Sequence, residues 1–156
     1  MSDTIFLRVG TEDHIPLSAF IESLRNFLLV LQDFDATISH DRRGSMVWEV
    51  ASLQKSSPPL VGVAPKKKPG HDDVAEVVEE QLIENTKMLS SSGERNQYMS
   101  DAALSKMERL AKLAPRLGPL AIYLNGKGAP KNEADITEGT LENVRQLTGV
   151  KYSAYG

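Results

Sequence analysis

No cysteine occurs among the 156 residues of the chain, which excludes disulfide bonds, thiolate metal ligands and a thiol nucleophile. Long apolar stretches are missing too. The longest uninterrupted one spans residues 27–31, whereas a membrane-spanning helix needs about 20 apolar residues. The start of the sequence lacks a basic segment followed by an apolar core, so no secretory signal is expected. These absences predict a soluble cytoplasmic protein.

A large excess of charge of either sign is also missing. Lys and Arg number 18 and Asp and Glu number 21, so the net charge of −3 does not favour nucleic acid as a partner. Apolar residues make up 40% of the chain, which favours a folded core over a disordered chain. The length fits one domain, which we place at residues 1–149, followed by a C-terminal tail at residues 150–156.

The strongest pattern in the chain predicts a long amphipathic helix over residues 17–39. Pro16 stands at its entry, where a missing N–H costs nothing, and a polar segment that ends in Gly44 closes it. Apolar residues follow one another at spacings of three, one or four, as on one face of a helix. The stripe that we expect to be buried consists of Leu17, Phe20, Ile21, Leu24, Phe27, Leu28, Leu31, Phe34 and Ile38.

Short apolar and β-branched runs predict four strands, at residues 5–9, 46–53, 60–64 and 120–124. A turn containing Pro58 and Pro59 separates the second strand from the third, so we expect these two to form an antiparallel hairpin. Trp48, in the second strand, should be buried against the long helix. Residues 65–70 have a proline near each end and are expected to form an exposed loop.

Three further helices complete the predicted order of elements. Asp72 or Asp73 is placed to cap the first, Ser100 opens the second, and the third runs from Thr137 to a stop at Gly149. The order is then β-α-β-β-α-α-β-α, in which strands do not alternate singly with helices. We therefore expect an α+β fold, with a four-stranded, mainly antiparallel sheet and the long N-terminal helix packed across it.

Three groupings of residues have a partial likeness to chemical sites. Asp33 and Asp35 resemble paired metal-binding aspartates, but inside a helix their carboxylates point about 160° apart. His71 precedes two aspartates that helix capping already explains. The Gly-Lys-Gly segment at residues 126–128 follows a strand as a phosphate-binding loop would, yet the hydroxyl residue after the lysine is missing. We predict no metal site and no cofactor, and the catalytic residues of any enzyme activity stay unknown.

Lys66, Lys67 and Lys68 form the main basic cluster, which could contact nucleic-acid phosphate or another anion. No aromatic residue lies between these lysines to stack on bases, and the chain is acidic overall. The favoured interpretation is therefore a solvated loop that helps solubility. Nucleic-acid binding through this loop is the weaker alternative.

Leu29 and Val30 lie outside the predicted buried stripe of the long helix. At about 100° per residue, Leu29 lies roughly 150° and Val30 roughly 110° from the centre of the stripe near Leu24 and Leu31. Full exposure of both would forgo about 1.5–3 kcal/mol of burial for each side chain. Either the helix is enclosed within its own domain, or this pair contacts another protein. We favour the contact and predict Leu29 and Val30 as partner-binding residues.

Three short segments carry a resemblance to known sequences: Ile15-Pro16-Leu17 at the helix start, Trp48-Glu49-Val50 in a strand, and Ser57-Pro58-Pro59-Leu60 after it. With this order of elements, the chain resembles the N-terminal portion of uncharacterised bacterial α+β proteins over most of its length. The resemblance implies a soluble bacterial protein, and in such proteins a small β-rich domain is expected to follow. It supplies no catalytic residue.

The leading hypothesis from the sequence is a non-catalytic module for protein interaction or assembly, which binds a protein partner or forms a homo-oligomer. The alternative is a small metal-independent hydrolase, because a catalytic triad can be assembled from residues far apart in the sequence. A pocket that holds a carboxylate or histidine of shifted pKa would favour the enzyme. An exposed apolar patch would favour the interaction module.

Overall fold

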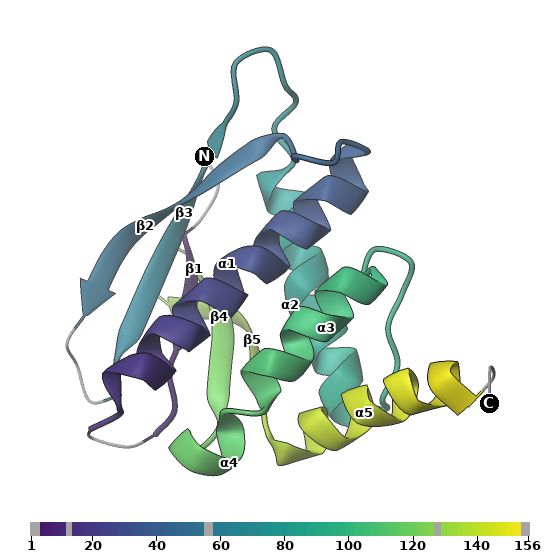
Figure 1. The fold of residues 1–156 in the computed structure, drawn as a ribbon. Helices are drawn as coiled ribbons and strands as arrows, with labels where there is room; N and C mark the ends of the chain where they lie inside the picture. The colour runs from purple at the N-terminus through teal and green to yellow at the C-terminus, as the bar shows by residue number, and fades with distance from the viewer. Residues whose placement is uncertain (1–3, 12–13, 55–57, 127–128, 154–156) are drawn as a thin grey trace.

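The computed structural model describes residues 4–11, 14–54, 58–126 and 129–153 (Figure 1). Its helices gather on one side of a single sheet (Figure 1). In chain order, the elements are β1 (Ile5–Arg8), α1 (Leu17–Ser39), β2 (Met46–Gln54), β3 (Leu60–Lys67), α2 (Ala75–Ser91), α3 (Asp101–Ala111), α4 (Ala114–Leu117), β4 (Leu120–Gly126), β5 (Ala129–Ile136) and α5 (Glu138–Ser153).

The sheet is antiparallel throughout, with the strand order β2-β3-β1-β4-β5. β1 lies at its centre, where Ile5 is opposite both Val63 of β3 and Leu124 of β4. All three side chains are buried in the same core as the apolar residues of the helices. Successive residues of a strand point to opposite faces of the sheet. The residues next to these three in the sequence therefore point to the face that has no helices.

The predicted α+β class, the antiparallel sheet and the long N-terminal helix are confirmed. The predicted strand number and element order are wrong, because β5 and the short helix α4 were not expected. The sequence of β5, Ala-Pro-Lys-Asn-Glu-Ala-Asp-Ile, is poor in the residues that favour strands. It forms a strand at the edge of the sheet, where a single neighbour, β4, suffices to hold it.

The exposed loop predicted at residues 65–70 is shorter than expected, because β3 continues through Pro65 to Lys67. Pro65 lies opposite Trp48 of β2. Among the described residues, β1 pairs with β3 as far as Val63, so beyond that residue the one described neighbour of β3 is β2. A proline in a strand is tolerated where no neighbour requires its missing N–H, and the free side of β3 offers such a place.

α1 begins at Leu17 and ends at Ser39, as predicted, but its buried face is rotated by roughly 80° from the predicted one, taking 100° per residue. Besides Asp35, the buried arc includes the uncharged polar residues Ser23 and Asn26. Each satisfies its own side chain by donating to the backbone carbonyl four residues earlier, at 2.8 Å for Ser23 and 2.9 Å for Asn26. The free-energy cost of burying these two side chains is therefore small, which allows the buried face of the helix to include them.

The predicted helix starts are close to the observed ones. An oxygen of Asp73 accepts the backbone N–H of Ala75 at 3.0 Å, and the Ser100 hydroxyl accepts that of Ala103 at 3.1 Å. The predicted stop at Gly149 is wrong, since α5 continues to Ser153 and takes in part of the expected tail at residues 150–156. Within the described ranges, no helix is both long enough and apolar enough to cross a membrane.

Candidate functional site

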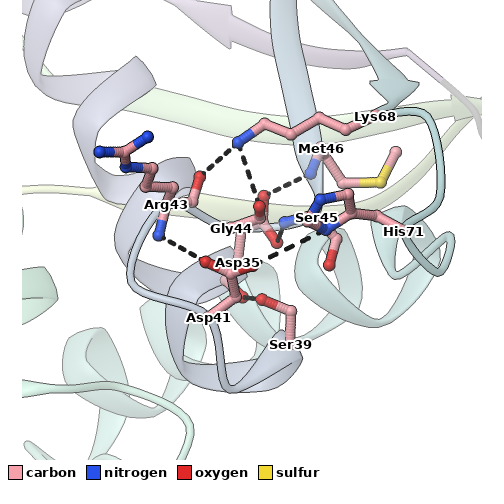
Figure 2. A network of polar contacts seen from close by, with 9 residues as sticks. All are labelled: Asp35, Ser39, Asp41, Arg43, Gly44, Ser45, Met46, Lys68 and His71. Atoms are coloured by element: carbon pink, nitrogen blue, oxygen red, sulfur yellow. Dashed lines mark hydrogen bonds and ion pairs between the residues drawn. The ribbon is translucent and has the colours of Figure 1, made fainter.

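A cluster of polar contacts lies between the end of α1 and the start of β2 (Figure 2). Asp35 of α1 is buried, and its two carboxylate oxygens accept the backbone N–H groups of Ser45, at 2.8 Å, and Met46, at 2.9 Å. Charge-assisted hydrogen bonds of this kind offset the cost of removing a carboxylate from water. Asp35 therefore fastens the first residues of β2 to α1.

Gly44 and Lys68 complete this cluster. Gly44 has a φ of +73°, and a Cβ added to it would lie 2.4 Å from an Asp35 carboxylate oxygen, so the turn requires glycine. The Lys68 ammonium donates to the carbonyls of Arg43, at 2.7 Å, and Gly44, at 3.1 Å. We call Asp35, Gly44 and Lys68 the turn clamp. Its contacts are internal to the fold, which indicates a structural role.

The three predicted anion-binding lysines do not form one free basic loop. Lys66 and Lys67 are exposed and belong to β3, whereas Lys68 is engaged in the turn clamp. Lys68 is also held through its main chain, because the backbone N–H of Lys68 donates to the carbonyl of Ser45, at 2.9 Å. Two exposed lysines remain available to an anion.

The two aspartates of α1 contact different elements. Asp33 forms an ion pair with Lys106 of α3 at 3.0 Å, whereas Asp35 faces the turn before β2. The expectation that their carboxylates diverge is confirmed. His71 lies 3.7 Å from Asp41, in a partly exposed pair. Among the described residues, no three His, Asp or Glu side chains are grouped as metal ligands. Lys127 and Gly128 lie outside the described residues.

Because the buried face of α1 differs from the predicted one, the two predicted partner-binding residues, Leu29 and Val30, lie in different surroundings. Val30 is fully buried in the core, so its prediction as a contact residue is wrong. The reason is that α3 packs beside α1, on the side where Asp33 meets Lys106, and encloses a face that would otherwise be exposed. Leu29 is only half-buried.

Apart from Val47, which points to the other face of β2, four large apolar side chains of α1 and β2 are exposed instead. Their exposed fractions are 72% for Leu17, 54% for Ile21, 43% for Val50 and 56% for Leu53. We call these four residues the apolar flank. None of them was predicted as a contact residue, because Leu17 and Ile21 belong to the stripe that was expected to be buried.

The two halves of the apolar flank face the same side of the molecule. Leu17, Ile21 and Asp35 lie within about 40° of one another around α1, and Asp35 contacts the start of β2. This line of α1 therefore faces β2. In β2, Val50 and Leu53 are opposite the buried residues Val63 and Val61 of β3, so they point to the helix-bearing side of the sheet.

α1 and β2 run in opposite directions, and the end of α1 meets the start of β2, so the last residues of β2 and the first turns of α1 lie toward the same end of the molecule (Figure 1). A register shift between Val50 and Ser52 keeps both Val50 and Leu53 on the helix-bearing side. A shallow hollow of about 550 Å³ adjoins the flank, between α1 and α3, and includes Ile21 with Glu22, Arg25 and Arg109. The flank is thus an apolar surface with charges of both signs beside it.

The face of the sheet without helices carries a second group of side chains. Phe6 of β1 stacks on Tyr123 of β4 with ring centroids 5.5 Å apart, and Arg8 lies 3.5 Å from Glu133. Burial raises the pKa of the Tyr123 hydroxyl, with a smaller lowering by Arg8 and a smaller raising by Glu133. Phe6 is buried in this group, and the Nε of Arg8 is buried without a hydrogen-bond partner among the described residues, so this face is covered in part by its own side chains.

Tyr123 gives a pH dependence of stability that can be tested. Because folding raises its pKa above the ordinary value of 10.0, the folded protein disfavours the phenolate. The contribution of Tyr123 is therefore complete below about pH 10 and is lost as the pH rises through the folded-state pKa. The difference in unfolding free energy between the unchanged chain and Tyr123→Phe should shrink between pH 8 and pH 11. A difference that stays constant over this range would contradict the assignment.

Comparison of the chain with models of protein families, with curated proteins and with solved structures finds no match.

Proposed function

We propose that this chain is a module for protein interaction or assembly and that its contact surface is the apolar flank. The exposure of Leu17, Ile21, Val50 and Leu53 on one side of the molecule carries the proposal. Apolar side chains scattered singly over a surface are ordinary, whereas a contiguous apolar group beside polar residues is typical of contact sites.

The energetics of burial support this use of the flank. Full burial of a leucine, isoleucine or valine side chain contributes about 1.5–3 kcal/mol. A partner that covers four such side chains, already about half exposed, gains several kcal/mol, which offsets part of the cost of association. The flank also sits on a helix and a strand that the turn clamp holds together, so little ordering is needed on binding.

Site-specific photocrosslinking in the native cells tests the proposal. A benzophenone amino acid in place of Ile21 should form covalent adducts of defined mass with a protein bound at the flank. The matched control carries the same amino acid in place of Val77 of α2, which is 44% exposed and lies outside the flank. We expect at least about tenfold more adduct at position 21 than at position 77, as for a group inside an interface rather than on a free surface.

Equal and low yields at the two positions would contradict the proposal. Adducts that contain RNA or DNA instead of protein would contradict it as well and would favour the nucleic-acid alternative. A protein adduct of twice the mass of the chain and an adduct with a different protein both support an interaction module, and they differ only in what the partner is.

A further inference from the structure

The hollow between α1 and α3 continues the apolar flank into a charged surface. It is shallow, has a volume of about 550 Å³, and is lined in part by Ile21, which also belongs to the flank. Arg25 follows Ile21 by four residues on α1 and lies about 40° further around the helix, so the two side chains are neighbours on its outer face. A protein that covers Ile21 therefore also meets the residues of the hollow.

Two arginines from different helices line the hollow. Arg25 belongs to α1 and Arg109 to α3, and both are exposed. Neither forms an ion pair with another residue in the part of the chain that the structure describes. Glu22 is the one carboxylate that lines the hollow, so two positive charges there are set against one negative charge. The hollow therefore has an excess of positive charge.

The neighbouring turn of the same two helices shows how a cation of α3 is neutralised elsewhere. Three residues before Arg109, Lys106 forms its ion pair with Asp33 of α1 at 3.0 Å. The buried residue of α1 that lines the hollow is instead Asn26, which is uncharged and donates its amide to the carbonyl of Glu22 at 2.9 Å. Among the described residues, Arg109 thus lacks the acidic partner that Lys106 has.

We propose that the partner of the apolar flank is a protein segment with acidic side chains next to its apolar ones, and that carboxylates of this segment bind Arg25 and Arg109 in the hollow. The proposal rests on the proposed function and names the chemistry of the partner. A guanidinium group holds a carboxylate through two parallel N–H···O bonds, and arginine is enriched at protein interfaces. The apolar flank supplies the buried apolar area, and the arginines select among apolar partners.

Charge complementarity favours an acidic segment over a basic or an uncharged one. A basic segment at the flank would place its charge next to Arg25 and Arg109, and like charges in contact at an interface oppose binding. An uncharged segment would remove water from the two guanidinium groups without supplying carboxylates in its place. The net charge of the chain, −3, gives an acidic partner no general attraction, so the selection depends on the local excess of arginine.

Charge reversal combined with photocrosslinking in the native cells tests the proposal. The benzophenone amino acid at position 21 detects the partner, and Arg109→Glu replaces one cation of the hollow by an anion. We expect this change to lower the yield of protein adduct about tenfold or more, because it places like charges in contact. The matched control is Arg145→Glu on α5, which changes the net charge equally at an exposed arginine outside the hollow. Circular dichroism and thermal unfolding establish that both variants are folded.

The adduct also identifies the chemistry of the partner. Mass spectrometry of the crosslinked peptides should place the adduct in a segment where Asp and Glu outnumber Lys and Arg. Exchange of the acidic residues of this segment for lysine should weaken adduct formation with the unchanged chain and restore it with Arg109→Glu. Such a rescue requires direct contact between the charges, because a structural effect of one substitution is not reversed by the other.

Two results would overturn the acidic-segment proposal. One is a yield that Arg109→Glu and Arg25→Glu lower no more than Arg145→Glu does. The other is a crosslinked segment of zero or positive charge, whether it belongs to another protein or to a second copy of this chain. In either case, the protein adduct at position 21 would leave the proposed function standing. A yield from the unchanged chain that is no higher at position 21 than at position 77 would remove both proposals together.

Discussion

Replacement of Trp48 by alanine is expected to lower the free energy of unfolding by about 3–5 kcal/mol. Trp48 is buried in the core and lies on β2, which contacts the long helix α1. Its removal leaves a cavity that the surrounding β-strand and helix can close only in part. Chemical denaturation followed by circular dichroism measures the loss without needing fluorescence, since Trp48 is the only tryptophan.

Trp48→Phe separates the packing of the aromatic ring from the burial of its polar N–H group. The indole Nε1 of Trp48 is buried and has no hydrogen-bond partner among the described residues. Phenylalanine removes this donor and retains most of the apolar volume, so its cost should be well below that of alanine, at about 1–2 kcal/mol. Equal costs for Trp48→Ala and Trp48→Phe, or native fluorescence typical of a water-exposed indole, would contradict the burial described above.

Asp35→Ala is expected to be the second large effect, with a loss of about 2–5 kcal/mol of unfolding free energy. The substitution leaves two buried backbone donors, at Ser45 and Met46, without their acceptor. An unsatisfied buried donor costs about 1–3 kcal/mol. Thermal or denaturant unfolding of the purified chain measures the loss.

Asp33→Ala is the matched control for this experiment, because it makes the same change two residues earlier on the same helix. Asp33 is partly exposed and has one ion-pair partner, Lys106, so its loss should cost about 1 kcal/mol or less. Gly44→Ala should reproduce much of the Asp35→Ala effect, since a Cβ there collides with the same carboxylate. An Asp35→Ala variant no less stable than Asp33→Ala would show that the turn clamp is unimportant.

The elements that the sequence predicted well are those whose local pattern agrees with the tertiary structure. The limits of α1, the hairpin of β2 and β3, and the start of α3 at Ser100 follow from apolar spacing, turn residues and a capping hydroxyl. β5 could not be predicted in this way, because its strand is created by pairing with β4 and not by its own residues. Pro65 is a similar case, since it lies beyond the described pairing of β3 with β1, which reaches Val63.

The candidate site was harder to predict, for a physical reason that concerns α1. A periodicity argument treats polar residues as exposed, yet Ser23 and Asn26 are buried because each bonds a carbonyl of its own helix. Short polar side chains can bond to their own helix in this way. A prediction that allowed for such bonds would have placed the buried face of α1 closer to Val30 and farther from Ile21. The position of Val50 depends on the register shift in β2, for which the sequence offers no clear signal.

Among the described residues, the hairpin of β2 and β3 has two parts of unequal local stability. Next to β1, β3 has a described strand on both sides, whereas from Ala64 to Lys67 its one described neighbour is β2, as in a two-stranded ribbon. An isolated two-stranded ribbon is marginal in water. Here two contacts with the helix layer, Trp48 and the bonds from Asp35, hold it closed. The ribbon is therefore a separate opening unit, and its amide hydrogens can exchange with solvent while the rest of the sheet stays folded.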